Sequence, residues 1–151
     1  MARSQLGSRP DAATKVASTR VKGVDEHEVA VAEAPLGVNV GVLCGPCSAP
    51  PEVRALPSGS RLATFALRCP AGDGRATSVP VTVWDPPAWL DTVDAGDVLV
   101  VVGRMRRRFY QRPSGLGSRV DVEAELVGRA RDRRRIDAAL RRADTALDAL
   151  R

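Results

Sequence analysis

The sequence is poor in aromatic residues and in the side chains that most often carry out catalysis. Only 3% of its 151 residues are aromatic, and it contains a single histidine. It has no stretch of about 20 apolar residues, which a membrane-spanning helix would need. The first ten residues, MARSQLGSRP, lack the apolar run of a secretory signal. We therefore expect a cytoplasmic protein that does not enter a membrane and whose core is built from Val, Leu and Ala.

Cysteine is scarce too, and its spacing suggests a redox motif that the neighbouring residues do not support. Cys44-Gly-Pro-Cys47 matches the thioredoxin-like pattern. That chemistry needs the first cysteine at the start of a helix, where the helix dipole lowers its pKa. Pro50 and Pro51 follow closely and disfavour such a helix. We expect the cysteines to be small buried apolar residues in a reducing compartment.

Metal binding and catalysis find no better support elsewhere in the chain. A zinc site would need four ligands, and the only cysteine and histidine side chains are His27, Cys44, Cys47 and Cys69. The long gap after the histidine and the absence of a second paired motif argue against zinc. Three carboxylates, Asp121, Glu123 and Glu125, alternate on one expected strand, where a solvated face is the simpler interpretation. We expect no catalytic residue, no metal and no cofactor, and thus no enzyme.

Composition divides the chain into three parts. Residues 1–38 are polar, small and aperiodic, which predicts a flexible N-terminal extension. Residues 39–128 contain five apolar stretches rich in β-branched residues, separated by Gly- and Pro-rich turns. Residues 129–151 lack Gly and Pro and predict an amphipathic C-terminal α-helix. The net charge is +5, and the positive excess lies in the second and third parts, which suggests an anionic partner.

The middle part is expected to form an all-β domain. Strands are predicted at 39–44, 61–69, 77–84, 97–110 and 119–127, with the Pro-rich residues 45–60 as a turn and 111–118 as a hairpin loop. A short helix or turn is expected at 85–96, between the third and fourth strands. Gly103 marks a bend or bulge in the long fourth strand. Five strands with long, bent members are typical of a closed or nearly closed barrel.

The fourth expected strand carries the strongest functional signal. Strand alternation places on one face Arg104, Arg106, Arg108 and Tyr110. The other face is expected to point into the core and carries Leu99, Val101 and Met105. Guanidiniums spaced about 7 Å apart suit a nucleic-acid backbone, and an aromatic ring suits its bases. Trp84, at the end of the third strand, is a second candidate for stacking, whereas Trp89 and Phe109 resemble packing residues.

The C-terminal helix carries a narrow apolar stripe. Its members follow the 4-3 spacing of a coiled-coil seam and are Ile136, Leu140, Ala143, Leu147 and Leu150. About two heptads are too short for a stable isolated coil. The stripe therefore needs a partner helix in an oligomer or a groove on its own domain, and its narrowness favours the partner helix. The basic segment from Arg131 to Arg135 leaves open a third role, extension of a nucleic-acid path.

Taken in order, these segments resemble the bacterial single-stranded DNA-binding proteins over roughly Asn39 to Val127. The resemblance is carried by Pro51-Glu-Val-Arg54, Leu56-Pro-Ser-Gly59, Leu62-Ala-Thr-Phe-Ala-Leu67, Val81-Thr-Val-Trp84 and Gly103-Arg-Met-Arg-Arg-Arg108. It implies a five-stranded OB-fold barrel with a short helix between strands 3 and 4, followed by the C-terminal α-helix. It also implies a homo-oligomer that binds single-stranded DNA in replication, repair and recombination.

The resemblance assigns DNA contacts by position and also marks departures. Trp84 and Tyr110 fall at stacking positions, and Arg54, Arg106 and Arg108 at basic ones. Ser78 and the pair Ala71 and Gly72 stand where relatives usually carry aromatics. The family's acidic, aromatic C-terminal tip is missing, so recruitment of repair proteins through it is not expected. The first hypothesis is sequence-independent single-stranded DNA binding; the alternative is a divergent OB-fold paralogue that acts as an assembly scaffold or an RNA- or protein-binding module.

Overall fold

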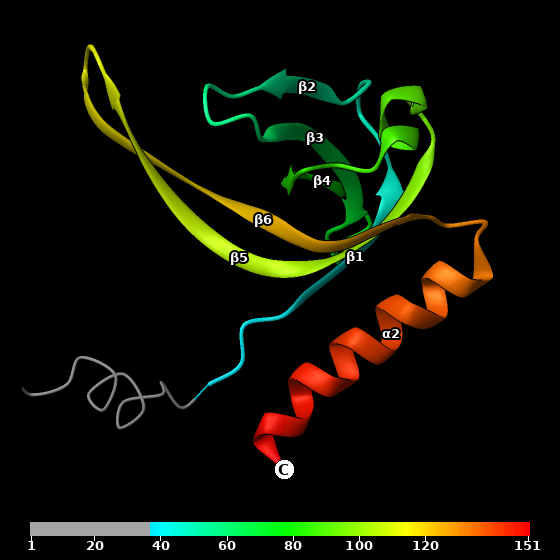
Figure 1. The fold of residues 1–151 in the computed structure, drawn as a ribbon. Helices are drawn as coiled ribbons and strands as arrows, with labels where there is room; N and C mark the ends of the chain where they lie inside the picture. The colour runs from blue at the N-terminus through cyan, green and yellow to red at the C-terminus, as the bar shows by residue number, and fades with distance from the viewer. Residues whose placement is uncertain (1–36) are drawn as a thin grey trace, which may run out of the picture. The chain divides into compact units, whose positions relative to one another are not determined.

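The protein folds around one strongly curved β-sheet. The computed structural model describes residues 37–151, so His27 and most of the predicted N-terminal extension lie outside the described residues. Six strands form the sheet in the order β1-β5-β6-β4-β3-β2 (Figure 1). Their bounds are β1 Gly41–Pro46, β2 Glu52–Ala55, β3 Arg61–Pro70, β4 Ala76–Trp84, β5 Val98–Arg112 and β6 Gly115–Arg129. A 3₁₀-helix, η1 (Ala88–Thr92), connects β4 to β5.

The expected five-stranded, closed or nearly closed barrel differs from the structure in two respects. The sheet has a sixth strand, β2, inside the Pro-rich segment predicted as a turn. β2 is short, pairs only with β3 and is mostly exposed, so it has no apolar alternation to reveal it. The sheet is also open, since no strand ladder joins β1 to β3, and only an isolated bridge pairs Cys47, just after β1, with Leu67 of β3. The short helical segment before the long strand is confirmed, as a 3₁₀-helix.

β5 and β6 form a long antiparallel ribbon whose turn is only Pro113 and Ser114, so the hairpin loop is shorter than predicted. Val102 pairs with Leu126 while Gly103 pairs with Ala124, which leaves Glu125 as the extra residue of a β-bulge. The predicted irregularity at Gly103 is confirmed. A Cβ at Gly103 would lie 2.1 Å from the carbonyl oxygen of Glu123, so only glycine allows the two strands to approach this closely.

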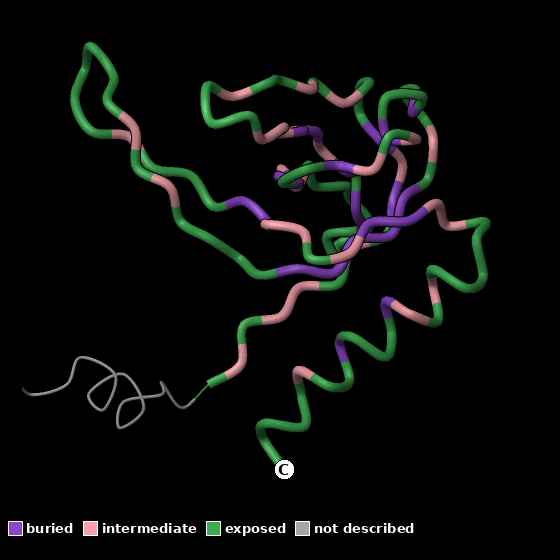
Figure 2. The backbone as a smooth tube through the Cα atoms, viewed as in Figure 1, coloured by how far each residue is buried: buried purple, intermediate pink, exposed green. Residues whose placement is uncertain are grey.

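The residues of the first half of β5 are nearly all buried (Figure 2). Because they point alternately to both faces of the strand, they contribute to two apolar clusters. Leu99 and Val101 face the main core inside the curved sheet, together with residues such as Leu67. Val100 and Val102 face outward and pack under the C-terminal helix. This double burial explains the continuous apolar run of the sequence in this strand.

The C-terminal helix α2 (Arg133–Leu147) lies against the outside of its own sheet. Asp132 caps its N-terminus by accepting a hydrogen bond from the backbone N of Arg135. Ala139 and Ala143 are buried against Val100 and Val102. Small residues on the helix allow this close approach to the sheet. No helix among residues 37–151 is long and apolar enough to cross a membrane.

The three cysteines are free thiols in different environments. Cys47 and Cys69 are buried as expected, but Cys44 in β1 is exposed, which corrects the expectation of burial for that residue. Burial, together with the negative charge of Asp97, raises the pKa of Cys47 to about 11. A thiol with such a pKa stays protonated at neutral pH.

Candidate nucleic-acid interface

Strand register brings Arg54 and Trp84 to one face of the sheet, here called the outer face. Leu62 in β3 pairs with Arg54 in β2 on one side and with Trp84 in β4 on the other. Directly paired residues point to the same side of a sheet, so these two side chains lie about 10 Å apart, two strand spacings. Both are exposed, and the indole of Trp84 is 45% exposed.

Glu123 of β6 ties this tryptophan to two of the predicted arginines. Its carboxylate accepts hydrogen bonds from Arg106 Nη1 at 2.9 Å and from Arg108 Nη2 at 3.2 Å. The indole Nε1 of Trp84 donates to the same carboxylate at 3.4 Å. One acidic side chain thereby holds a flat ring and two guanidiniums on the outer face in a fixed arrangement.

Asp121, two residues earlier in β6, is buried rather than solvated, so the expectation of a solvated acidic face is wrong for it. Only 1% of this residue is exposed. Its Oδ2 accepts from Arg108 Nε at 2.8 Å and from Thr82 Oγ1 at 2.9 Å. Its Oδ1 has no hydrogen-bond partner within residues 37–151. A buried carboxylate depends strongly on its charged partner, so Arg108 has a structural role in addition to any role in binding.

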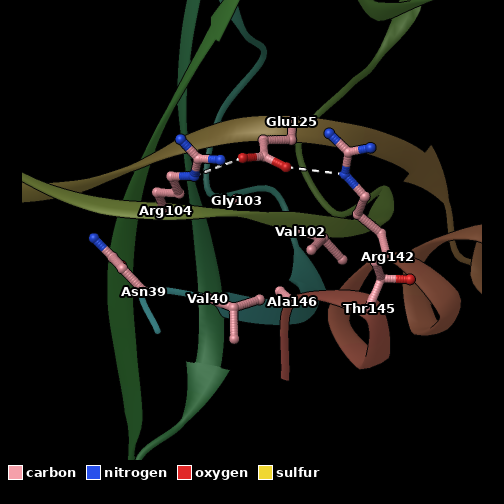
Figure 3. A pocket seen from close by; sticks show the side chains of 9 residues that line it. All are labelled: Asn39, Val40, Val102, Gly103, Arg104, Glu125, Arg142, Thr145 and Ala146. Carbon is pink, nitrogen blue, oxygen red and sulfur yellow. Dashed lines mark hydrogen bonds and ion pairs between the residues drawn. The ribbon is translucent and has the colours of Figure 1, made fainter. Parts of the chain in front are cut away.

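Arg104 is paired differently from the other arginines of β5. Glu125, the bulge residue, accepts from Arg104 Nε at 2.8 Å and from Arg142 Nε at 2.9 Å (Figure 3). Arg142 belongs to α2, so one carboxylate joins a guanidinium of the sheet to one of the helix. The outer face of β5 therefore continues onto the side of α2 that lies over β6.

Tyr110 lies near the tip of the β5–β6 ribbon, on the same face as these arginines. Arg112 stacks over its ring at 4.8 Å from the centroid. The ring covers Gly117 of β6, where a Cβ would lie 2.7 Å from it. A hollow of about 490 Å³ beside it is lined by Arg108, Phe109, Tyr110, Arg112 and Arg119. An aromatic edge with several guanidiniums around an open hollow suits a stacked base and its phosphate.

The opposite face of the ribbon differs from expectation. Met105 was expected in the core and Phe109 in a packed position, but they are 53% and 62% exposed. β4 pairs with β6 only at Val122 and Glu123, so the ribbon beyond them has no strand beside it and no sheet opposite its inner face. Arg107 instead covers the ring of Phe109, 5.1 Å from its centroid. Trp89 packs against the main core, as expected.

The residues that sequence reasoning missed are the acidic partners of the arginines. A strand with alternating arginines, followed after a tight turn by one with alternating acids, predicts cross-strand ion pairs. That signal is present in the sequence at Asp121, Glu123 and Glu125. Thr82 carries no such signal, because its hydrogen bond to Asp121 depends on the parallel pairing of β4 with β6.

The curved sheet, the helical segment before the long ribbon and the C-terminal helix are consistent with an OB-fold. The chain matches the Single-strand binding protein family over residues 38–132 and belongs to that family. A search of curated proteins gave no match. Among solved structures, the chain is similar to a deletion mutant of the single-stranded DNA binding protein from Thermus aquaticus, with 25% identity and a TM-score of 0.52. The match covers 61% of this chain and 40% of the Thermus chain.

Proposed function

We propose that this protein binds single-stranded DNA without sequence preference and without catalysis, through the outer face of its sheet. The proposed contacts are Arg54, Trp84, Arg104, Arg106, Arg108 and Tyr110. Guanidiniums would pair with phosphates, and the two rings would stack on bases, each stacked base contributing roughly 1–3 kcal/mol. Ring faces and phosphates are common to all nucleotides, so this surface has no means of reading sequence.

The observation that supports this proposal most directly is the arrangement around Glu123. A half-exposed indole and two guanidiniums are held together by its carboxylate, at 2.9 to 3.4 Å. Groups held in place before binding lose little conformational freedom when the ligand arrives. The same pairing has a second consequence: Arg106 and Arg108 must exchange a carboxylate for a phosphate when DNA binds.

Indole fluorescence tests the proposal. Stacking on Trp84 should quench its emission when single-stranded DNA is added, and Trp84→Ala should weaken binding by roughly 5- to 100-fold, equivalent to one lost stacked base. For a short strand of about 6 nucleotides, which covers the outer face alone, Trp89→Ala is the matched control, because Trp89 packs against the core and its loss should leave both quenching and affinity nearly unchanged. If the folded protein shows no binding, the alternative of an OB-fold scaffold or protein-binding module takes precedence. Loss of quenching only in Trp89→Ala would place the contact at η1 instead.

We further propose that α2 mediates self-association through the part of its apolar stripe that its own sheet leaves uncovered. The predicted stripe divides: Ile136 and Ala143 contact the sheet. The remaining members are exposed, Leu140 at 57%, Leu147 at 40% and Leu150 at 67%. Leu140 and Leu147 lie seven residues apart on one flank of the helix, and Leu150 follows in the 3₁₀-helix η2 (Asp148–Leu150). This spacing suits packing against a second helix.

Substitutions on this flank test self-association without unfolding the domain. The double substitution Leu140→Asp with Leu147→Asp should reduce the mass of the assembly, measured by sedimentation velocity, because buried carboxylates between two helices are strongly unfavourable. Thr145→Asp is the control and should leave the mass unchanged, because Thr145 lies on the other flank of the helix, beside Arg142 (Figure 3). Deleting α2 is a poorer test, because it would uncover Val100 and Val102 at about 1.5–3 kcal/mol each. An unchanged mass in the double variant would refute the role of this flank.

A further inference from the structure

A second aromatic and basic site lies at the C-terminal end of β6, the end opposite the ribbon tip. Arg129, the last residue of β6, stacks on the ring of Trp89 at 5.3 Å from the centroid. Its guanidinium also pairs with Asp97 at 3.1 Å and donates to Thr92 Oγ1 at 3.0 Å. These contacts fix the guanidinium and the partly exposed indole as one rigid surface.

Two hollows adjoin this surface. One, of about 280 Å³, is lined by Trp89, Arg129, Arg131, Asp132 and Arg135. The other, of about 310 Å³, shares Arg129 and Arg131 with the first. No carboxylate of residues 37–151 forms an ion pair with Arg131 or Arg135. The nearest carboxylate in sequence, that of Asp132, caps the helix by accepting from the backbone N of Arg135. The first hollow thus combines an aromatic side chain with two guanidiniums that form no ion pair within the described residues, beside the cap carboxylate of Asp132. An aromatic ring and free guanidiniums are the features that suit a nucleotide.

A row of arginines connects this hollow to the outer face. Glu125 joins Arg104 of β5 to Arg142 of α2 (Figure 3). Arg135 lies seven residues before Arg142, so both occupy the same flank of the helix, about 10 Å apart along its axis. The row ends at the first hollow, because Arg135 lines that hollow together with Arg131. The helical members Arg135 and Arg142 lie outside the segment 38–132 that matches the family.

We propose that the strand bound on the outer face continues along this flank of α2 and that the hollow beside Trp89 holds a further nucleotide of the same strand. This inference rests on the proposed function and extends the binding path onto the helix. From Arg108 to Arg104 the path follows β5 for about 13 Å, and the helix adds about 10 Å. Single OB-folds bind roughly 4–16 nucleotides, so a short strand covers the outer face alone and a longer one reaches the hollow.

The test compares two double variants with two DNA lengths, using the full chain and fluorescently labelled oligothymidine of about 6 and about 25 nucleotides. Arg131→Gln with Arg135→Gln removes the two unpaired guanidiniums of the hollow. Arg134→Gln with Arg141→Gln removes the same charge from the exposed side of α2 and is the matched control. The first variant should bind the long strand roughly tenfold more weakly, with a salt slope smaller by about 1.4, which corresponds to two lost phosphate contacts. Its affinity for the short strand should match that of the parent chain, and the control should change neither.

A second measurement reports the ring directly. In a Trp84→Phe chain, the long strand should quench Trp89 and the short strand should not. Equal losses in the two double variants would show a general charge effect and overturn the inference. So would an equal loss for short and long strands in the first variant, because the hollow would then belong to the primary contact. If the parent chain binds neither strand, the proposed function itself fails, which is distinguishable from both of these outcomes.

Discussion

Replacing Arg108 by alanine is expected to lower the free energy of unfolding by about 3 kcal/mol. Arg108 is the charged partner of Asp121, whose side chain is 0% exposed. Removing one member of a buried ion pair costs about 3–5 kcal/mol, because the other charge is left buried. The lower end applies here, since the Arg108 side chain is 35% exposed and its loss admits some water to the carboxylate. Urea unfolding followed by circular dichroism measures the change.

Two further variants give this prediction its controls. Arg106 pairs with Glu123 at the surface and its side chain is 56% exposed, so Arg106→Ala should cost about 1 kcal/mol or less. Adding Asp121→Asn to Arg108→Ala removes the stranded charge and should restore much of the lost stability. Equal stabilities for the two single arginine variants would contradict a structural role of Arg108. Because Arg108→Ala is expected to destabilise the fold, a loss of DNA binding in that variant could come from unfolding. Arg106→Ala is therefore the better variant for measuring the contribution of an arginine to binding.

Glu123→Gln is expected to tighten binding of single-stranded DNA. The carboxylate of Glu123 neutralises Arg106 and contributes to the neutralisation of Arg108, and it also repels an incoming phosphate. Glutamine retains an oxygen that accepts the indole hydrogen bond of Trp84 but carries no charge. We expect roughly a three- to tenfold gain in affinity at low salt. The dependence of log affinity on log salt should steepen by about 0.7 for each guanidinium freed for phosphate.

Fluorescence anisotropy at several salt concentrations measures both quantities. Asp137→Asn is the matched control, because it removes one negative charge from the exposed surface of α2, where no ion pair involves Asp137 within the described residues. A general charge effect would change both variants alike, and that result would remove Glu123 from the proposed interface. A gain confined to Glu123→Gln, and lost at high salt, would support competition between carboxylate and phosphate.

The face that carries the candidate arginines was predictable because strand alternation is a local property. Arg104, Arg106 and Arg108 share a parity in any regular strand, and their contacts with Glu125, Glu123 and Asp121 confirm that they lie on one face. The alternation does not indicate which elements of the fold cover each face of the strand. Met105 has the parity of the core residues, yet it is exposed, because no second sheet layer reaches that part of the ribbon.

The burial of Asp121 and the position of α2 depend on tertiary contacts that no local pattern encodes. Asp121 is buried because Thr82 and Arg108 reach it from strands on both sides of β6. The narrow stripe of α2 favoured a facing helix, but small Ala139, outside the predicted stripe, allows the helix to dock on its own sheet. β2 was missed for a related reason: four mostly exposed residues between prolines contain too little alternation to identify a strand.

The bulge at Glu125 also restricts how the length of this chain can change during evolution. On its N-terminal side, Val122 points into the core; on its C-terminal side, Val127 does so. These residues are five apart, an odd number, and only the extra residue allows both to face inward. A single insertion between them would enlarge the bulge or turn one half of β6 over. Deletion of the extra residue would restore regular alternation but remove Glu125, which pairs with Arg104 and Arg142. At the ribbon tip, by contrast, residues can be gained or lost in opposing pairs with every face preserved. We therefore expect natural length variation in this hairpin to gather at Pro113 and Ser114 and to spare the segment from Val122 to Val127.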